Sequence, residues 1–180
     1  IATSENSVVF CSPSLPSSNL MDRRCVDKVS MVDEGIWIAF AGILGDGRHV
    51  TRKARQFCRE YNAKFSCKPT VAALAHHIGS IQHEASIKGG ERPLGLHVLC
   101  VGFDDGEDNN KSGSPLMFLS KSSGEVTQWK ATAIGKNSEK VFSLLEDKIG
   151  DSIGEQEAIR VAGEVLGSAK VLLYICIYIY

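Results

Sequence analysis

The sequence has no marked excess of charge of either sign. Its 20 lysine and arginine residues nearly balance 21 aspartate and glutamate residues, so the formal net charge is -1 at pH 7. Broad electrostatic affinity for nucleic acid or for acidic membranes requires a strong basic excess. The charge balance therefore predicts that the partners of this protein include no nucleic acid and no membrane.

Long apolar runs are also lacking. A membrane-spanning helix needs roughly 20 consecutive apolar residues, and the closest candidate, Val171 to Tyr180, is far shorter. Its isoleucine and tyrosine content favours a strand instead. No secretory signal is visible at the start of the sequence, which begins with Ile1.

Paired metal-binding motifs are missing as well. The six cysteines are scattered, and none forms a Cys-x-x-Cys pair. His76 and His77 are neighbours, and neighbouring side chains on a helix point about 100° apart, whereas a helical metal site uses residues four apart. We expect no metal site and no cofactor, and we interpret the cysteines as reduced residues of a cytosolic protein.

The sequence does contain strand-like segments in groups and helix-like segments in pairs. Apolar stretches predict strands, and apolar residues at spacings of three and four predict helices. The predicted strands cover residues Ser7–Cys11, Cys25–Val32, Gly35–Gly42, Leu96–Phe103, Pro115–Ser120, Val126–Ile134 and Val171–Tyr180. The predicted helices follow Asp46 and Thr70, begin again at Asn137 or Ser138, and end with a fourth helix over about residues 155–166.

Short local signals mark the ends of the first two helices. Asp46 is expected to cap the first helix through its side chain, and Thr70 to start the second after a proline. Gly89–Gly90 would end the second helix. The Arg92–Pro93 step then predicts a turn into the next strand, because proline restricts the residue before it.

The order of the elements predicts the fold class. Strands, two helices, three strands, two helices and a last strand do not alternate as in a doubly wound sheet. The strands Gly35–Gly42 and Leu96–Phe103 are apolar on both faces, which requires cover on both sides. We predict an α+β protein, a four-layer αββα sandwich of two antiparallel sheets flanked by helix pairs.

Three ordered motifs stand out in this pattern. They are CVDKVSMVDEGIWIAFAGILGDGRHVTRKAR at 25–55, GGERPLGLHVLCVGFDD at 89–105 and SSGEVTQWKATAIGKNSEKVFSLLE at 122–146. Together these motifs resemble proteasome subunits of the alpha type, and the resemblance spans roughly Val8 to Leu166. Arg-Pro-Leu-Gly at residues 92–95 has Leu94 where that family usually has an aromatic residue.

The resemblance implies a single proteasome-subunit-like domain over residues 1–180, with the N-terminal gate segment absent. It implies a non-catalytic subunit of the outer ring of the proteasome core particle, supporting assembly, substrate gating and activator docking in ubiquitin-dependent protein degradation. The implied partners are other proteasome alpha and beta subunits and proteasome activators or regulatory ATPases. The implied location is the cytoplasm and nucleus.

Two alternatives remain open. The first is a catalytic beta-type subunit in which processing exposes Thr3 as an N-terminal nucleophile. Against it, Ala2 stands where those relatives carry glycine, no aspartate follows Val8–Phe10, and too few residues separate Thr3 from Lys28. The second alternative is a free-standing scaffold domain that shares the fold.

The resemblance also assigns candidate binding residues. Lys28 would pair with the C-terminal carboxylate of an activator tail, and Gly42 and Ile43 would line the same pocket and offer backbone donors. A lysine at the end of a strand is otherwise simply solvated, and both interpretations stay open. Arg48 and Arg92 each follow a turn and could form intersubunit salt bridges or remain exposed arginines.

Overall fold

The computed structural model describes residues 1, 7–13, 28–103, 115–149, 153–168 and 173–179. The chain divides into two compact units, one formed by residues 28–129 and the other by residues 1–27 and 130–180. Each unit contains strands and helices and is described by itself.

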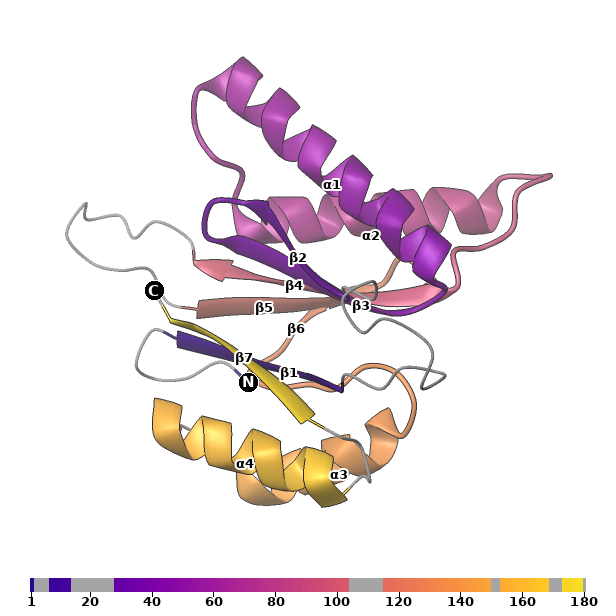
Figure 1. The fold of residues 1–180 in the computed structure, drawn as a ribbon. Helices are drawn as coiled ribbons and strands as arrows, with labels where there is room; N and C mark the ends of the chain where they lie inside the picture. Colours follow the sequence, from indigo (N-terminus) through magenta and orange to yellow (C-terminus); the bar gives the residue numbers. More distant parts are fainter. Residues whose placement is uncertain (2–6, 14–27, 104–114, 150–152, 169–172, 180) are drawn as a thin grey trace, which may run out of the picture. The chain divides into compact units, whose positions relative to one another are not determined.

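The unit of residues 28–129 is built on a five-stranded sheet. The strand order is β2-β3-β4-β5-β6, and every neighbouring pair is antiparallel. The strands are β2 (Val29–Asp33), β3 (Ile36–Gly42), β4 (Leu96–Phe103), β5 (Pro115–Ser120) and β6 (Val126–Gln128). Helices α1 (Leu44–Phe65) and α2 (Val71–Ile87) lie against one face of this sheet (Figure 1).

The apolar stripe of α2 forms the centre of this unit. Leu74 and Ile78 are fully buried, and they belong to one cluster with Ile38 of β3 and Val98 of β4. Thr70 caps the helix, since its side chain accepts a hydrogen bond from the Ala73 amide at 3.2 Å. The predicted stripe and the predicted cap of this helix are therefore both confirmed.

The other unit pairs the two ends of the chain. Strand β1 (Ser7–Pro13) runs antiparallel to β7 (Leu173–Ile179), with Phe10 opposite Cys176. Helices α3 (Ser138–Lys148) and α4 (Glu155–Ser168) pack on each other, and α4 contacts both strands. Apolar residues of β1, α3 and α4 form a separate core that includes Val9, Leu145, Ala158 and Val165.

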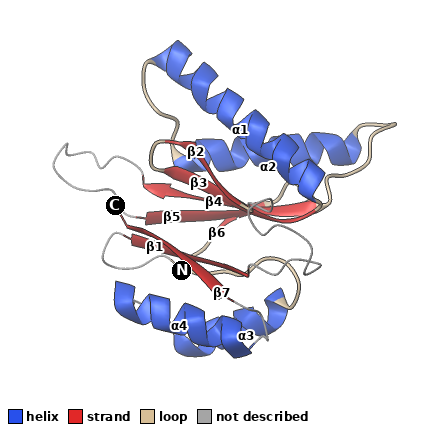
Figure 2. Cartoon of the chain, viewed as in Figure 1, coloured by secondary structure: helices blue, strands red, loops and turns tan. Residues whose placement is uncertain are grey.

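The element order and the α+β class predicted from the sequence are confirmed (Figure 2). Two details were wrong. Strand β6 ends at Gln128 rather than Ile134, and Asp46 is not the cap of α1, because the helix begins one turn earlier with Ile43 at the N-cap. In the part of the chain that the structure describes, no helix is long and apolar enough to cross a membrane.

Candidate functional site

The candidate site lies where β3 ends and α1 begins. Ile43 is the N-cap residue of α1, and the residue is 50% exposed. Its amide donates to the Gly95 carbonyl at 2.9 Å, and its own carbonyl accepts the first helical hydrogen bond, from the Gly47 amide at 3.0 Å. The turn is therefore fixed from two directions by backbone hydrogen bonds.

Gly42 permits a close approach between this turn and the start of β4. Its φ is +140°, a conformation that other residues rarely adopt. A Cβ atom at this position would lie 2.1 Å from the Gly95 carbonyl oxygen and 2.7 Å from the Leu96 Cα. Both the backbone conformation and the available space therefore require glycine here.

Asp46 and Arg92 form an ion pair beside this turn. Arg92 Nη1 donates to Asp46 Oδ2 and Arg92 Nη2 to Asp46 Oδ1, both at 2.7 Å, in the bidentate geometry that suits arginine and carboxylate. The Gly95 amide also donates to Asp46 Oδ2, at 3.0 Å. The Asp46 side chain is 10% exposed and that of Arg92 is 61% exposed.

The pair changes the proton affinity of both groups. The hydrogen bonds from Arg92 are the main reason that the pKa of Asp46 is lowered, although burial acts in the opposite direction. The same contacts raise the pKa of Arg92. Asp46 is therefore a carboxylate at neutral pH whose charge is compensated within the chain.

Lys28 lies next to the same turn. Its carbonyl accepts a hydrogen bond from the Phe40 amide at 3.0 Å, and the next residue, Val29, pairs with Ala39. Lys28 is thus opposite Phe40, two residues before Gly42, and it is exposed. The register of β2 and β3 places Lys28 at the same end of the sheet as Gly42 and Ile43, where β3 leads into α1 (Figure 1).

The other predicted site residues, Arg48 and Arg92, differ from Lys28, Gly42 and Ile43 in their surroundings. Arg48 is exposed near the start of α1, and its side chain has no hydrogen bond or ion pair with the residues that the structure describes. Arg92 has an intrachain partner, Asp46, and a further contact to a neighbouring subunit stays a prediction. The Ile43 amide is already engaged by Gly95, so Ile43 offers a side chain rather than a donor. Thr3 lies outside the described residues.

A groove lies between α1 and α2, and Lys28, Gly42 and Ile43 are not part of its lining. The groove has a volume of about 640 Å³, with Phe57, His77 and Leu94 in its lining. The Phe57 and His77 rings stack with centroids 4.2 Å apart, and burial lowers the pKa of His77. Among the described residues, no group of three or more His, Cys, Asp or Glu side chains could hold a metal ion.

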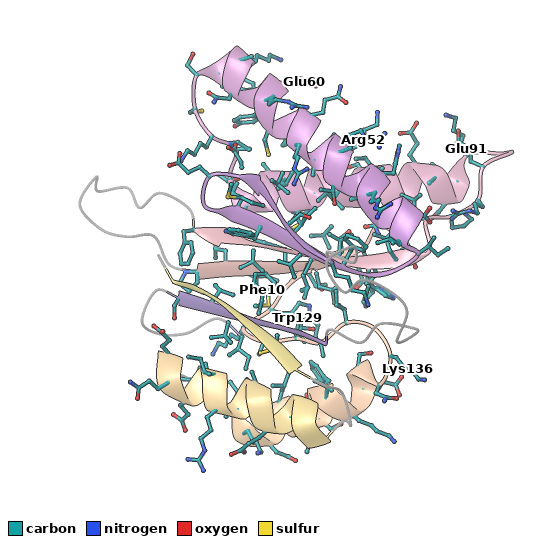
Figure 3. The ribbon with its side chains drawn as sticks, viewed as in Figure 1. Phe10, Arg52, Glu60, Glu91, Trp129 and Lys136 are labelled. Atoms are coloured by element: carbon teal, nitrogen blue, oxygen red, sulfur yellow. The ribbon has the colours of Figure 1, made fainter. Side chains whose placement is uncertain are left out.

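The exposed face of α1 is charged. Arg52 and Glu60 lie on this helix and are exposed (Figure 3). Glu60 accepts a hydrogen bond from Gln56, one turn earlier, at 2.7 Å. Charge of both signs on one helix face is typical of a solvated or subunit-facing surface rather than of a binding site for nucleic acid.

Comparison with known proteins places the chain in a family. The model of the family described as proteasome subunit matches residues 2–171. This chain belongs to the proteasome subunit family. The family resemblance inferred from the sequence motifs is thereby confirmed.

Curated relatives of this proteasome family chain are named alpha-type subunits. "Proteasome subunit alpha type-7" of Dictyostelium discoideum is 33% identical over 150 residues, which are 83% of this chain and 57% of the relative. "Proteasome subunit alpha type-2" of the same organism is 34% identical over 144 residues, or 80% of this chain and 59% of the relative. "Proteasome subunit alpha type-7" of Cicer arietinum is 33% identical over 155 residues, with 84% and 60% covered. The chain therefore spans somewhat less than two thirds of the length of these relatives.

The ion pair between Asp46 and Arg92 is the part of the site that sequence reasoning missed. The local sequence predicts a helix cap at Asp46, and the family resemblance predicts an intersubunit contact at Arg92. The two residues are 46 positions apart, and no local pattern connects them. The sequence signal for this pairing is that Asp46 lies near Gly42 in one family motif and Arg92 lies near Gly95 in another, and these two glycines pack against each other.

Proposed function

We propose that this chain is a non-catalytic subunit of the outer ring of the proteasome core particle. In this role it supports assembly, substrate gating and activator docking in ubiquitin-dependent protein degradation, in the cytoplasm and nucleus. The observation that carries the proposal is the family match over residues 2–171 together with the three relatives described above, which are named alpha-type subunits. Its partners would be other alpha and beta subunits and the activators or regulatory ATPases of the particle.

The proposal includes the finer architecture. We infer that the chain forms a single domain, a four-layer αββα sandwich. Each described unit supports this inference, because each has an antiparallel sheet that carries a pair of helices. Such layers bury the strands β3 and β4, which are largely buried along their length.

A beta-type threonine protease is the competing function. The alpha-type names of the relatives argue against it, as does the sequence around Thr3. A covalent probe directed at N-terminal threonine should leave this chain unlabelled in purified particles. Labelling of the chain that disappears with Thr3→Ala would overturn the non-catalytic assignment.

We further propose that Lys28, Gly42 and Ile43 receive the C-terminal carboxylate of an activator tail. The lysine ammonium is a compact charge that suits a free carboxylate. The positive end of α1, which begins at Leu44, favours an anion at the same place. The exposed Ile43 side chain offers an apolar contact for the residues before the carboxylate.

The docking role is tested in particles that contain this chain. Lys28→Ala should leave the native mass of the particle unchanged and weaken binding of a peptide that copies an activator tail. Lys64→Ala is the matched control. Lys64 is also an exposed lysine of this unit, but it lies in the last turn of α1, roughly 30 Å along the helix from its first residue, Leu44. Equal binding by both variants would contradict the docking role.

Arg48 and Arg92 are proposed as contacts to neighbouring alpha subunits. Arg48 is exposed on α1, and the Arg92 side chain remains more than half exposed beside Asp46. Particles that carry Arg48→Ala should assemble more slowly than wild type. The native mass of the purified wild-type protein tests the alternative of a free-standing scaffold domain. A mass equal to that of the single chain would favour that alternative.

A further inference from the structure

Three backbone segments meet at the ion pair between Asp46 and Arg92. Asp46 is in the first turn of α1, Arg92 precedes the Pro93 turn, and Gly95 lies just before β4. One carboxylate accepts from the Arg92 guanidinium and from the Gly95 amide. We call this set of contacts the Asp46 clasp.

The clasp continues directly into the turn proposed to bind the carboxylate. Gly95 donates its amide to Asp46 and accepts the Ile43 amide with its carbonyl. The position of Gly95 therefore determines where the Ile43 backbone lies. Gly42 also packs closely against this carbonyl oxygen, since a Cβ atom on Gly42 would lie only 2.1 Å from it, so backbone packing joins the turn to Gly95 in addition to the hydrogen bond.

The clasp also affects the electrostatics of the turn. Asp46 is three residues after Ile43, so its carboxylate is within about 5 Å of Ile43 along the helix axis. An uncompensated carboxylate there would repel an incoming carboxylate. Arg92 compensates this charge through its two hydrogen bonds.

We propose that Asp46 and Arg92 are positioning residues for the carboxylate-binding turn: their ion pair holds Gly95 against Ile43 and so presents Gly42 and Ile43 to the ligand beside Lys28. This inference rests on the proposed docking function of Lys28, Gly42 and Ile43. The ligand is a peptide that ends in a free carboxylate. The clasp does not touch the ligand and acts through the geometry of the turn.

The test separates positioning from simple charge effects. Asp46→Asn removes a negative charge, and Arg92→Ala removes a positive one. If only charge mattered, Asp46→Asn would strengthen binding of a peptide carboxylate and Arg92→Ala would weaken it. If the clasp positions the turn, both variants weaken binding, by roughly fivefold, which corresponds to about 1 kcal/mol.

The measurement is the affinity of particles containing this chain for a tail peptide with a free C-terminus, compared with its C-terminal amide. Arg92→Lys keeps the charge and one of the two contacts, so it should recover part of the affinity. Glu91→Gln is the matched control, because it breaks the exposed ion pair between Lys88 and Glu91 next to the clasp. Ile78→Val, a buried core change in α2, controls for general destabilisation, and it should lower the melting temperature without changing the affinity.

The outcomes distinguish the two proposals. If Lys28→Ala weakens peptide binding but Asp46→Asn and Arg92→Ala do not, the clasp proposal fails and the docking function stands. If Lys28→Ala also has no effect, the docking function fails and the clasp proposal fails with it.

A second measurement does not depend on ring assembly. In the full chain alone, Asp46→Asn should accelerate hydrogen exchange of the Ile43 amide, which donates to Gly95. Glu91→Gln should not change it. An unchanged exchange rate at Ile43 in Asp46→Asn would overturn the proposal even where the variant particles do not form.

Discussion

A buried polar pair between α2 and the sheet gives the sharpest test of how the larger unit is held together. Gln82 and Ser120 are both completely buried. The Gln82 amide Nε2 donates to the Leu96 carbonyl at 3.0 Å, and the Ser120 hydroxyl donates to Gln82 Oε1. One glutamine side chain therefore connects α2 to both β4 and β5.

The cost of breaking this pair follows from the groups left without partners. Ser120→Ala leaves Gln82 Oε1 buried and unpaired, which should lower the free energy of unfolding by about 1–3 kcal/mol. Gln82→Met keeps the size of the side chain but leaves both the Ser120 hydroxyl and the Leu96 carbonyl unpaired, at roughly 2–4 kcal/mol. In the double variant only the Leu96 carbonyl is unpaired, so the two single losses overlap, and their sum should exceed the loss in the double variant by at least about 2 kcal/mol.

Urea denaturation of the wild type, the two single variants and the double variant measures the overlap. The comparison requires that the free energy of unfolding has the same dependence on urea concentration in all four proteins. Ser80→Ala is the control, because the Ser80 hydroxyl donates to the His76 carbonyl on the exposed side of the same helix. Its effect should stay within about 0.5 kcal/mol. Losses that add within about 0.5 kcal/mol in the double variant would show that the two side chains do not act as one buried pair.

Three further predictions concern space, protonation and thiol reactivity. Gly47→Ala should destabilise the protein by about 1–3 kcal/mol in thermal melts, because its Cβ would lie 2.1 Å from a ring carbon of Phe40 in β3. Gly45→Ala is the control: the space around Gly45 is open, so this substitution should be neutral or stabilising. Burial lowers the pKa of His77 from 6.5, so the unfolded state binds the proton more tightly; the free energy of unfolding should fall as the pH drops below about 6.5, and less so in His77→Phe, measured by urea denaturation. Burial raises the pKa of the Cys100 thiol to about 12, so a maleimide at pH 7.5 should modify the exposed Cys67 in the native chain and reach Cys100 only in denaturant, as peptide mass spectrometry would show.

The regular elements were predictable because their signals are local. The stripe of α2 repeats at helical spacing, and Thr70 supplies its cap within the same stretch of sequence. The buried strand β4 follows a turn whose proline and glycine are visible in the sequence. In such cases the residues that form an element also contain the evidence for it.

The end of β6 shows where this reasoning stops. Residues 126–134 have strand-like composition, yet β6 ends at Gln128, opposite Phe118, and one further hydrogen bond to β5 follows, from the Trp129 amide to the Met117 carbonyl at 2.9 Å. From Lys130 onward the chain belongs to the other unit. A strand needs a partner as well as a propensity, and the composition of a segment does not say where its partner ends.

Buried polar residues show a different limit. Gln82 falls on the buried side of α2, four residues after Ile78, but it is not apolar and therefore adds nothing to the apolar periodicity that predicts the helix. Its polar groups are tolerated because Leu96 and Ser120, which are 14 and 38 residues away in the sequence, satisfy them. A polar residue at an apolar position of a helix is thus a signal for a buried hydrogen bond, but its partners come from the tertiary structure.

The candidate site depends on the same kind of nonlocal pairing. By the local rule for helix starts, Asp46 should cap its own helix, but its carboxylate binds Arg92 and the Gly95 amide instead. The Arg-Pro-Leu-Gly segment is locally only a turn, and it becomes part of a site because Gly42 leaves room for the Gly95 carbonyl. Each segment supplies what the other lacks: one contributes the carboxylate and the close-packed glycine, and the other contributes the guanidinium and the backbone amide. Neither motif by itself therefore defines the turn, and a substitution in residues 92–95 should alter the geometry of Gly42 and Ile43 as surely as one in the turn itself.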